Sequence, residues 1–214
     1  MLLQDLRMKL IQIALRAQRE NLIPLTFGNF SIRDKETGYI CITPSGMEYS
    51  LLVPEDIVVV DSDCNIIDGK RKPSIEVAMH CMTFRERPDV FGIAHTHSTF
   101  ATAWASCCED IPAVVAEVAA LVGSSISCAP YRPMGTIELA QVVVDYLKDK
   151  YAVLLANHGL LAVGPSIEVA YANAVIVEEG AKVAFYGKQI GIIKYIPDEE
   201  CMNLRRIAME KSGQ

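Results

Sequence analysis

Apolar residues recur every three or four positions along several stretches of the chain, and this spacing predicts amphipathic helices. The longer predicted helices cover residues 2–21, 74–87, 136–150 and 166–188, and a last helix starts at residue 197 and frays after Glu210. Shorter helical stretches are predicted over 51–56, 100–107 and 112–121. The buried face of the first helix should carry Leu3, Leu6, Leu10, Ile13 and Ala14.

Shorter apolar runs, some of them alternating with polar residues, predict the strands. A hairpin is predicted over 26–46, around a polar turn that contains Gly38. Further strands are predicted from residue 57 and over 90–99, 125–131, 151–158 and 160–164. The mixed order of helices and strands indicates an α/β layered fold, and the absence of a composition break predicts a single domain over 1–214.

The helix predicted over 74–87 carries the most informative carboxylate. Pro73 and Ser74 form a helix start with Ser74 as N-cap, which places Glu76 in the first turn, where free backbone NH groups favour a carboxylate. His80 lies one turn later on the same face. It is either a partner that supports the site or a packed polar residue, and the sequence favours packing.

The apolar run that starts at Val90 ends in two histidines one residue apart, His95 and His97. Alternate residues of a strand point to the same face, so both imidazoles can be aimed at one metal ion. An H-x-H pair alone is equally consistent with polar strand ends that are satisfied by hydrogen bonds. A second apolar run ends in His158, and with Glu76 these residues make a zinc-type ligand set.

Small polar residues and glycines stand at the two ends of the predicted hairpin. Its first segment opens with Gly28 and Asn29, and its second segment closes with Thr43, Ser45 and Gly46 around Pro44. Glycine allows backbone NH groups to approach an anion, and hydroxyl and amide side chains add donors, so these ends can form a phosphate cradle. Taken alone, such residues are more often an ordinary turn.

Composition and charge argue against several classes of protein. The chain has 214 residues, is 51% hydrophobic and carries a formal net charge of −6, so it lacks the basic footprint of a nucleic-acid binder. Its seven cysteines have no C-x-x-C spacing and are predicted to be reduced thiols of a cytoplasmic protein. Charges at Asp5, Arg7, Lys9 and Arg16 interrupt the N-terminal apolar pattern, so neither a signal peptide nor a membrane span is predicted.

Taken together, these motifs resemble the class II aldolase/adducin family, and within it the L-fuculose-1-phosphate aldolase branch. The segments GNFS, ITPSG, KPSIE, HTH, CAPY with GT, and NHG occur in the family's order over nearly the whole chain. The resemblance implies a three-layer α/β/α sandwich around a mostly antiparallel central sheet. It also implies a cyclic homotetramer with active sites at subunit interfaces.

The resemblance further implies how the site works. His95, His97 and His158 would bind zinc or another divalent ion such as cobalt, manganese or iron, and Glu76 would be the acid/base that also touches the metal. The phosphate group of the substrate would be held by Asn29, Ser45, Gly46 and Ser74. The expected reaction cleaves a phosphorylated ketose, L-fuculose 1-phosphate by default, to dihydroxyacetone phosphate and a small aldehyde through a stabilised enediolate.

The sequence departs from the family pattern on the aldehyde side of the expected site. Ala116 and Met134 stand where the branch has aromatic residues, and the C-terminal tail has no tyrosine. The phosphate motif has Ile75 in place of a serine. A more apolar pocket makes a deoxy- or methylthio-pentulose 1-phosphate a candidate substrate. Glu117 could replace the missing acid, although an exposed helix residue is the favoured interpretation.

Other activities on the same scaffold stay open. Pentulose-phosphate 4-epimerases of the family resemble this chain but have Asp at the position of Glu76 and an acid near Ala120 that is absent here, which favours cleavage. A sugar-phosphate dehydratase is a further alternative. The non-enzymatic adducin heads lack the metal histidines, whereas this chain has all three, so a binding module is the least favoured alternative.

Overall fold

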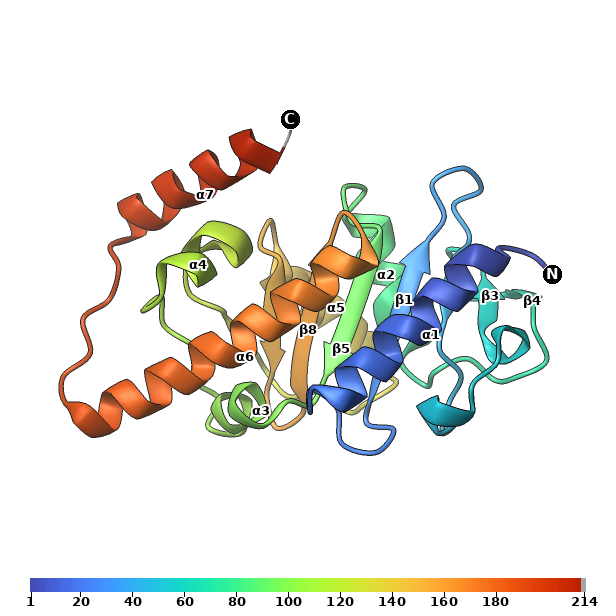
Figure 1. The fold of residues 1–214 in the computed structure, drawn as a ribbon, viewed down its shortest axis with the longest axis horizontal. Coiled ribbons are helices and arrows are strands. Elements are labelled where there is room, and N and C mark those ends of the chain that lie inside the picture. Colours follow the sequence, from blue (N-terminus) through green and yellow to red (C-terminus); the bar gives the residue numbers. More distant parts are fainter. Residues whose placement is uncertain (213–214) are drawn as a thin grey trace.

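The computed structural model describes residues 1–212, which form one central sheet with helices on both sides (Figure 1). Within these residues, eight strands are ordered β4-β3-β2-β1-β5-β8-β7-β6. Neighbouring strands are antiparallel, except that β6 and β7 are parallel. The strands are β1 (Gly28–Arg33), β2 (Ile40–Ile42), β3 (Val58–Val60), β4 (Ile66–Asp68), β5 (Gly92–Thr96), β6 (Cys128–Ala129), β7 (Ala152–Leu155) and β8 (Gly159–Gly164).

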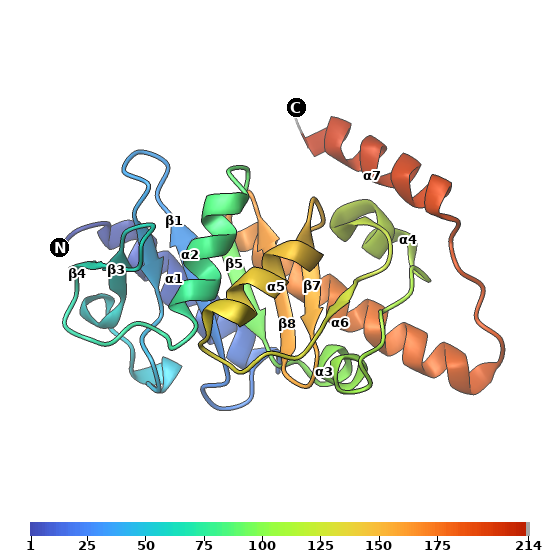
Figure 2. The same cartoon turned by 180° about the vertical axis from the view of Figure 1, so that it is seen from behind.

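Helices cover both faces of this sheet. In Figure 1, α1 (Gln4–Arg19) and α6 (Ile167–Ile190) lie in front of the strands, and Figure 2 shows α2 (Val77–Glu86) and α5 (Ile137–Leu147) on the opposite face. The remaining α-helices are α3 (Thr99–Ser106), α4 (Ala116–Val118) and α7 (Asp198–Ser212). The predicted three-layer α/β/α sandwich around a mostly antiparallel sheet is therefore confirmed.

The alternation of side chains along β5 decides which layer the site occupies. Ile93 belongs to the apolar core between the sheet and the α2/α5 layer, whereas Ala94 belongs to the core beneath α1 and α6. Alternate residues of a strand share a face, so His95 lies on the same side as Ile93. His95 therefore faces the layer that contains α2, the helix directly after Glu76.

Most predicted elements are present with shorter ends, but the helix predicted over 112–121 is wrong in its first half. Helical structure starts only at α4 and continues as a π-helical turn over Ala119–Gly123. Upstream, the backbone of Ile111 forms an isolated antiparallel bridge with Ile126. This pairing holds the start of the segment in an extended conformation beside Ile126, which overrides the local apolar pattern.

Two other local predictions also need correction. Glu76 and not Ser74 takes the N-cap position of α2, because the helix begins only at Val77; the Ser74 hydroxyl accepts the backbone NH of Glu76. The helical turn predicted over 51–56 is two 3₁₀ turns, Tyr49–Leu51 and Pro54–Asp56. An extended residue precedes Pro54, as expected from the clash between a proline ring and the residue before it.

None of the helices in residues 1–212 is both long and apolar enough to cross a bilayer. The assignment of a single domain to residues 1–214 stays a prediction, and residues 213–214 lie outside the described range.

Candidate active site

Three histidines meet where β5 ends beside the start of β8. Thr96 of β5 is paired with Leu160 of β8, so His97, one residue past β5, lies next to the turn that carries His158. One ligand nitrogen from each of His95, His97 and His158 lies within 4.8 Å of the others. The Nε2 atoms of His95 and His97 are 3.0 Å apart. The predicted meeting of the three imidazoles is therefore present in the structure.

Hydrogen bonding and burial prepare these imidazoles as ligands. Nδ1 of His95 is 2.9 Å from the carbonyl oxygen of Leu160, and it donates there because a carbonyl only accepts. Nε2 of a neutral His95 then presents its lone pair to the cluster. Burial, and next the charges of His97 and His158, lower the pKa of His95 well below its usual value. Burial likewise lowers the pKa of His97 to about 4, so both rings are neutral near pH 7.

The carboxylate of Glu76 faces the same cluster and is almost completely buried. Its Oε2 lies 3.2 Å from Nε2 of His95, and its Oε1 lies 3.3 Å from Nε2 of His158. Oε1 has no hydrogen-bond partner within the described residues. A buried oxygen without a donor beside three converging imidazole nitrogens is a donor set that suits a divalent cation. The cluster can therefore bind a metal ion.

A cavity of about 260 Å³ opens beside these groups. Its wall includes His97, His158 and Glu76, together with most of the residues predicted to hold a phosphate: Gly28, Asn29, Ser45, Gly46 and Ser74. Thr43 is the exception, because its hydroxyl is buried and accepts the backbone NH of Phe30. One cavity thus joins the histidine cluster to a set of small polar residues.

Comparison with known proteins places this site in a family. Residues 8–185 match the Class II Aldolase and Adducin N-terminal domain, which is most of the chain. The chain belongs to the class II aldolase and adducin family. This family member is 39% identical over 206 residues to a 5-deoxy-D-ribulose 1-phosphate aldolase from Bacillus thuringiensis serovar kurstaki, an alignment that covers 96% of each chain.

Solved structures agree with the family assignment. An L-fuculose 1-phosphate aldolase superposes with a TM-score of 0.93 at 34% identity, over 98% of this chain and 97% of the other. The L-fuculose-1-phosphate aldolase from Thermus thermophilus superposes with a TM-score of 0.76 at 27% identity, over 86% of this chain and 94% of the other. The arrangement of helices around the central sheet is therefore that of a class II aldolase fold.

The residues predicted to form the aldehyde pocket are separated in this family member. Met134 lines the cavity, together with Phe27 and Ile75, so the lining has an apolar part. Ala116 and Glu117 are exposed residues of α4 and do not line this cavity. Within one chain, the structure brings only Met134 of the three predicted residues to the site.

The structure adds a group that the sequence had assigned to simple packing. His80 is fully buried, and its Nε2 lies 2.5 Å from Oδ1 of Asn29, whose Nδ2 donates to Oε2 of Glu76 at 2.8 Å. On the other side of the ring, Nδ1 lies 2.6 Å from the hydroxyl of Ser31. The preference for packing was wrong, because His80 reaches Glu76 through Asn29. Its position four residues after Glu76 was the available sequence signal.

Acidification from pH 6.5 to about 5 is expected to destabilise the metal-free protein through His80. Burial lowers the pKa of His80 to about 3, against about 6.5 in an unfolded chain. Between these values the unfolded chain binds a proton that the folded chain does not. Stability is therefore full above pH 6.5 and falls with pH, by up to about 1.4 kcal/mol per unit. Urea unfolding at several pH values measures this slope.

The matched control is His80→Gln, which removes the titrating ring and leaves His95 and His97 in place. The variant should show a shallower loss of stability than the wild type over the same pH interval. Parallel slopes for the two proteins would contradict the assigned burial of a neutral His80.

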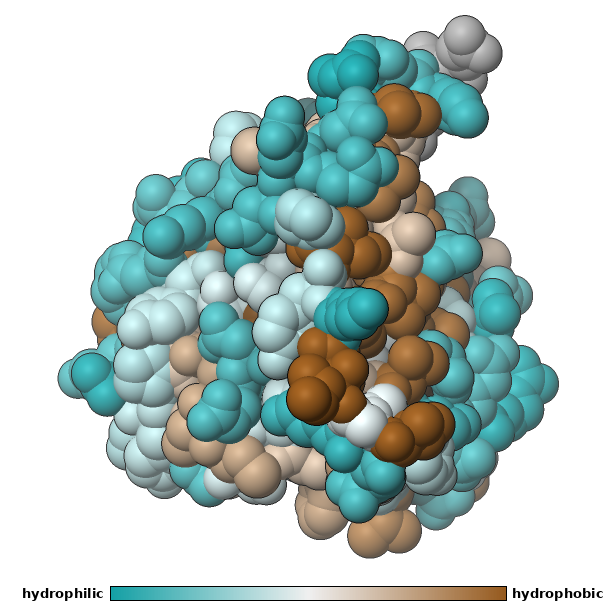
Figure 3. Space-filling view, turned by 90° about the vertical axis from the view of Figure 1, so that its left-hand side faces the viewer, coloured by the Kyte–Doolittle hydropathy of each residue, from teal (hydrophilic) through white to brown (hydrophobic). Residues whose placement is uncertain are grey.

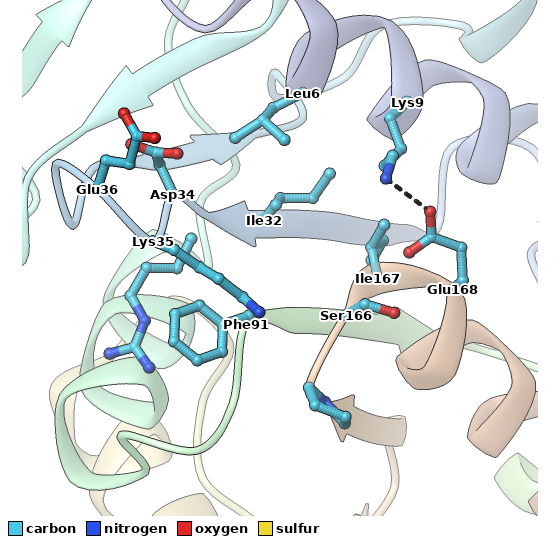
Figure 4. A pocket seen from close by; sticks show the side chains of 12 residues that line it. Leu6, Lys9, Ile32, Asp34, Lys35, Glu36, Phe91, Ser166, Ile167 and Glu168 are labelled. Carbon is cyan, nitrogen blue, oxygen red and sulfur yellow. Dashed lines mark ion pairs between the residues drawn. The ribbon is translucent and has the colours of Figure 1, made fainter. Parts of the chain in front are cut away.

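A second cavity, of about 350 Å³, lies where β1 ends and α6 begins (Figure 4). Lys9 and Glu168 form an ion pair of 2.9 Å across it. Arg33, another lining residue, donates to backbone carbonyls, including those of Phe84 and Val90. Lys9, Arg33 and Glu168 are thus paired with other groups of the protein, and no predicted site residue lines this cavity. The histidine cavity is therefore the candidate active site.

Proposed function

We propose that this chain is a metal-dependent aldolase that cleaves a ketose 1-phosphate to dihydroxyacetone phosphate and a small aldehyde. The observation that carries the proposal is the meeting of three histidines and Glu76 on the wall of one cavity. The aldolase activities of the relatives at 39% and 34% identity support the same reaction class.

His95, His97 and His158 would hold the metal ion, with Glu76 as an additional contact before substrate binds. Zinc is the favoured ion, since imidazole nitrogens suit it well, and cobalt, manganese and iron(II) suit the same ligands. When bound, a divalent ion supplies the Lewis-acid charge that makes an enediolate accessible. The three neutral imidazoles leave that positive charge undiminished.

Glu76 would move the proton at the reacting carbon. In cleavage the C3–C4 bond breaks, its electron pair passes into the enediolate of the C1–C3 fragment, and the C4 hydroxyl passes its proton to the Glu76 carboxylate as the aldehyde forms. Glu76 then protonates C3, and in synthesis it removes that proton from dihydroxyacetone phosphate. Its free Oε1, next to His158 and at the cavity wall, is the oxygen available for this transfer.

Gly28, Asn29, Ser45, Gly46 and Ser74 would receive the phosphate. Gly46 has φ of 69°, a conformation that glycine adopts readily, and this turn opens onto the cavity. At Gly28 a Cβ would lie 2.7 Å from the carbonyl oxygen of His95, so this close approach of β1 to β5 needs glycine. Phosphate binding at this end would orient the reacting carbons.

The apolar part of the cavity favours a substrate with a deoxy end. Phe27, Ile75 and Met134 line the cavity and are largely exposed. A methyl group suits such a wall better than a hydroxyl group does. L-Fuculose 1-phosphate also ends in a methyl group, but a 5-deoxy-pentulose 1-phosphate, the substrate class in the name of the Bacillus relative, has one polar CHOH group fewer on the aldehyde side and is therefore the preferred candidate.

A panel of ketose 1-phosphates tests this preference, with release of dihydroxyacetone phosphate as the readout. We expect kcat/KM for 5-deoxy-ribulose 1-phosphate to exceed that for ribulose 1-phosphate by about 10- to 100-fold, the range in which an apolar pocket discriminates. Equal values would contradict the apolar pocket. Absence of cleavage, with epimerised or dehydrated product instead, would support the epimerase or dehydratase alternative.

The active form is proposed to be a cyclic homotetramer in the cytoplasm, with active sites between subunits. Ala116 and Glu117 do not line the cavity of their own chain, so a neighbouring chain would have to bring them to a site. Exposed apolar residues also gather where α6 ends and the link to α7 begins (Figure 3), with Ile190 87% and Ile192 98% exposed. Analytical ultracentrifugation measures the assembly directly.

A further inference from the structure

A chain of hydrogen bonds runs from the interior of the protein to Glu76. It links Ser31 in β1 to His80 in α2, His80 to Asn29 in β1, and Asn29 to Glu76, with heavy-atom distances of 2.6, 2.5 and 2.8 Å. Ser31 and His80 are completely buried, and Asn29 and Glu76 are buried as well. Because Ser31 and His80 have no access to water, the protons along this chain have only certain allowed positions.

The direction is set at the Glu76 end. A carboxylate oxygen accepts hydrogen bonds, so the Asn29 atom that faces Oε2 of Glu76 is the amide nitrogen Nδ2. The amide oxygen Oδ1 then faces His80, and Nε2 of His80 must carry the proton that Oδ1 accepts. Burial keeps the ring neutral, so Nδ1 has no proton and accepts the hydroxyl of Ser31.

We propose that His80 is a positioning residue which, with Ser31, holds the Asn29 amide so that its nitrogen faces Glu76 and its oxygen faces the interior. An amide turned by 180° would set its oxygen against the Glu76 carboxylate and its nitrogen against the NH of His80, so both partners favour the same orientation. The hydrogen bond from Asn29 Nδ2 to Oε2 fixes the orientation of the Glu76 carboxylate. Its other oxygen, Oε1, then points toward His158 and has no hydrogen-bond partner. The contribution of His80 to turnover rests on the acid/base role proposed for Glu76.

The tautomer of His80 tests the amide orientation without any use of activity. The chain contains four histidines, so selective ¹⁵N-histidine labelling gives few resonances, and a His80→Gln sample identifies those of His80. Long-range ¹H–¹⁵N spectra should show a protonated Nε2 and an unprotonated Nδ1 at neutral pH. The reverse tautomer would place a lone pair opposite the Asn29 amide and would overturn the proposal.

Two conservative substitutions then test the effect on turnover. The amide of glutamine reaches the position of an imidazole Nε2, so His80→Gln keeps a donor for Asn29. The amide of asparagine reaches only the position of Nδ1, so His80→Asn keeps a partner for Ser31 and loses the donor. Loss of a hydrogen bond that orients a charged group predicts a kcat lower by about 10- to 100-fold in His80→Asn. The kcat of His80→Gln should stay within about threefold of the wild-type value, because a threefold change in rate corresponds to less free energy than one such hydrogen bond contributes.

Metal content should be unchanged in both variants, and KM for the ketose phosphate should change less than kcat. Equal losses of kcat in two folded variants would overturn the positioning role, since a merely structural histidine gives no rescue by glutamine. If His80→Asn does not fold, the tautomer of His80 in the wild-type protein decides whether the proposal holds. A wild-type protein without aldolase activity would contradict the proposed function, and the tautomer would still report the amide orientation.

Discussion

Glu76→Gln is expected to lower kcat for release of dihydroxyacetone phosphate by about 10²- to 10⁴-fold, the usual contribution of a positioned acid or base. Glutamine keeps the shape of the side chain but cannot carry the proton to or from C3. The metal should stay bound, because three histidine nitrogens within 4.8 Å of one another remain. Steady-state kinetics and elemental analysis of the same sample measure the two effects separately.

Glu86→Gln is the matched control for this substitution. Glu86 ends the same helix, α2, but its side chain lies beside Arg85 at the surface, away from the histidine cluster. This variant should retain the kcat of the wild type. A Glu76→Gln protein that also retains it would remove Glu76 from the proposed acid/base role.

The local pattern of the sequence was sufficient for the two histidines of β5 and for the helix that follows Glu76. Their prediction needed only the two-residue repeat of a strand and the signals that precede a helix. The distance between His95 and His158, by contrast, depends on β5 pairing with β8, more than sixty residues away. Motif order in a known family supplied that relation, since periodicity contains no information about which strands are neighbours.

The errors have a common physical origin in long-range contacts. The backbone NH of Ser74 bonds to the carbonyl of Thr43, and the backbone of Ile111 pairs with that of Ile126. In both segments the helix therefore begins later in the chain than the local sequence predicts. In the sequence, Arg7 is one of the charges that interrupt the apolar pattern of the first helix, and that pattern does not indicate its burial. It is buried, and it donates to the carbonyl of Ile57 and to Asp68, which ties α1 to the β3/β4 edge. Single polar residues with distant partners are not visible in a periodic pattern.

His95→Ala should remove both metal and activity. His95 contributes one of three converging imidazoles, and alanine has no side-chain atom that can bind a metal in its place. The metal content should fall from about one ion per chain toward zero, because only two imidazoles and the Glu76 carboxylate remain of a set of four donors. The kcat should fall by about 10³-fold or more, since the Lewis-acid contribution is lost.

His80→Gln is the control for this loss, as it changes the one histidine outside the cluster and should keep the metal. Circular dichroism checks that His95→Ala is folded, and His97→Ala, at a less buried position, provides a second test if it is not. An adducin-like binding module predicts the opposite result, in which His95→Ala is tolerated and neither protein contains metal.

Metal content of the purified wild-type protein, paired with release of dihydroxyacetone phosphate before and after chelation, tests the central claim most directly. We predict about one divalent ion per chain, loss of cleavage on chelation, and recovery when zinc or another divalent ion is restored. Cleavage that persists in protein stripped of metal, or a folded protein with no metal and no cleavage of any ketose 1-phosphate, would contradict the account.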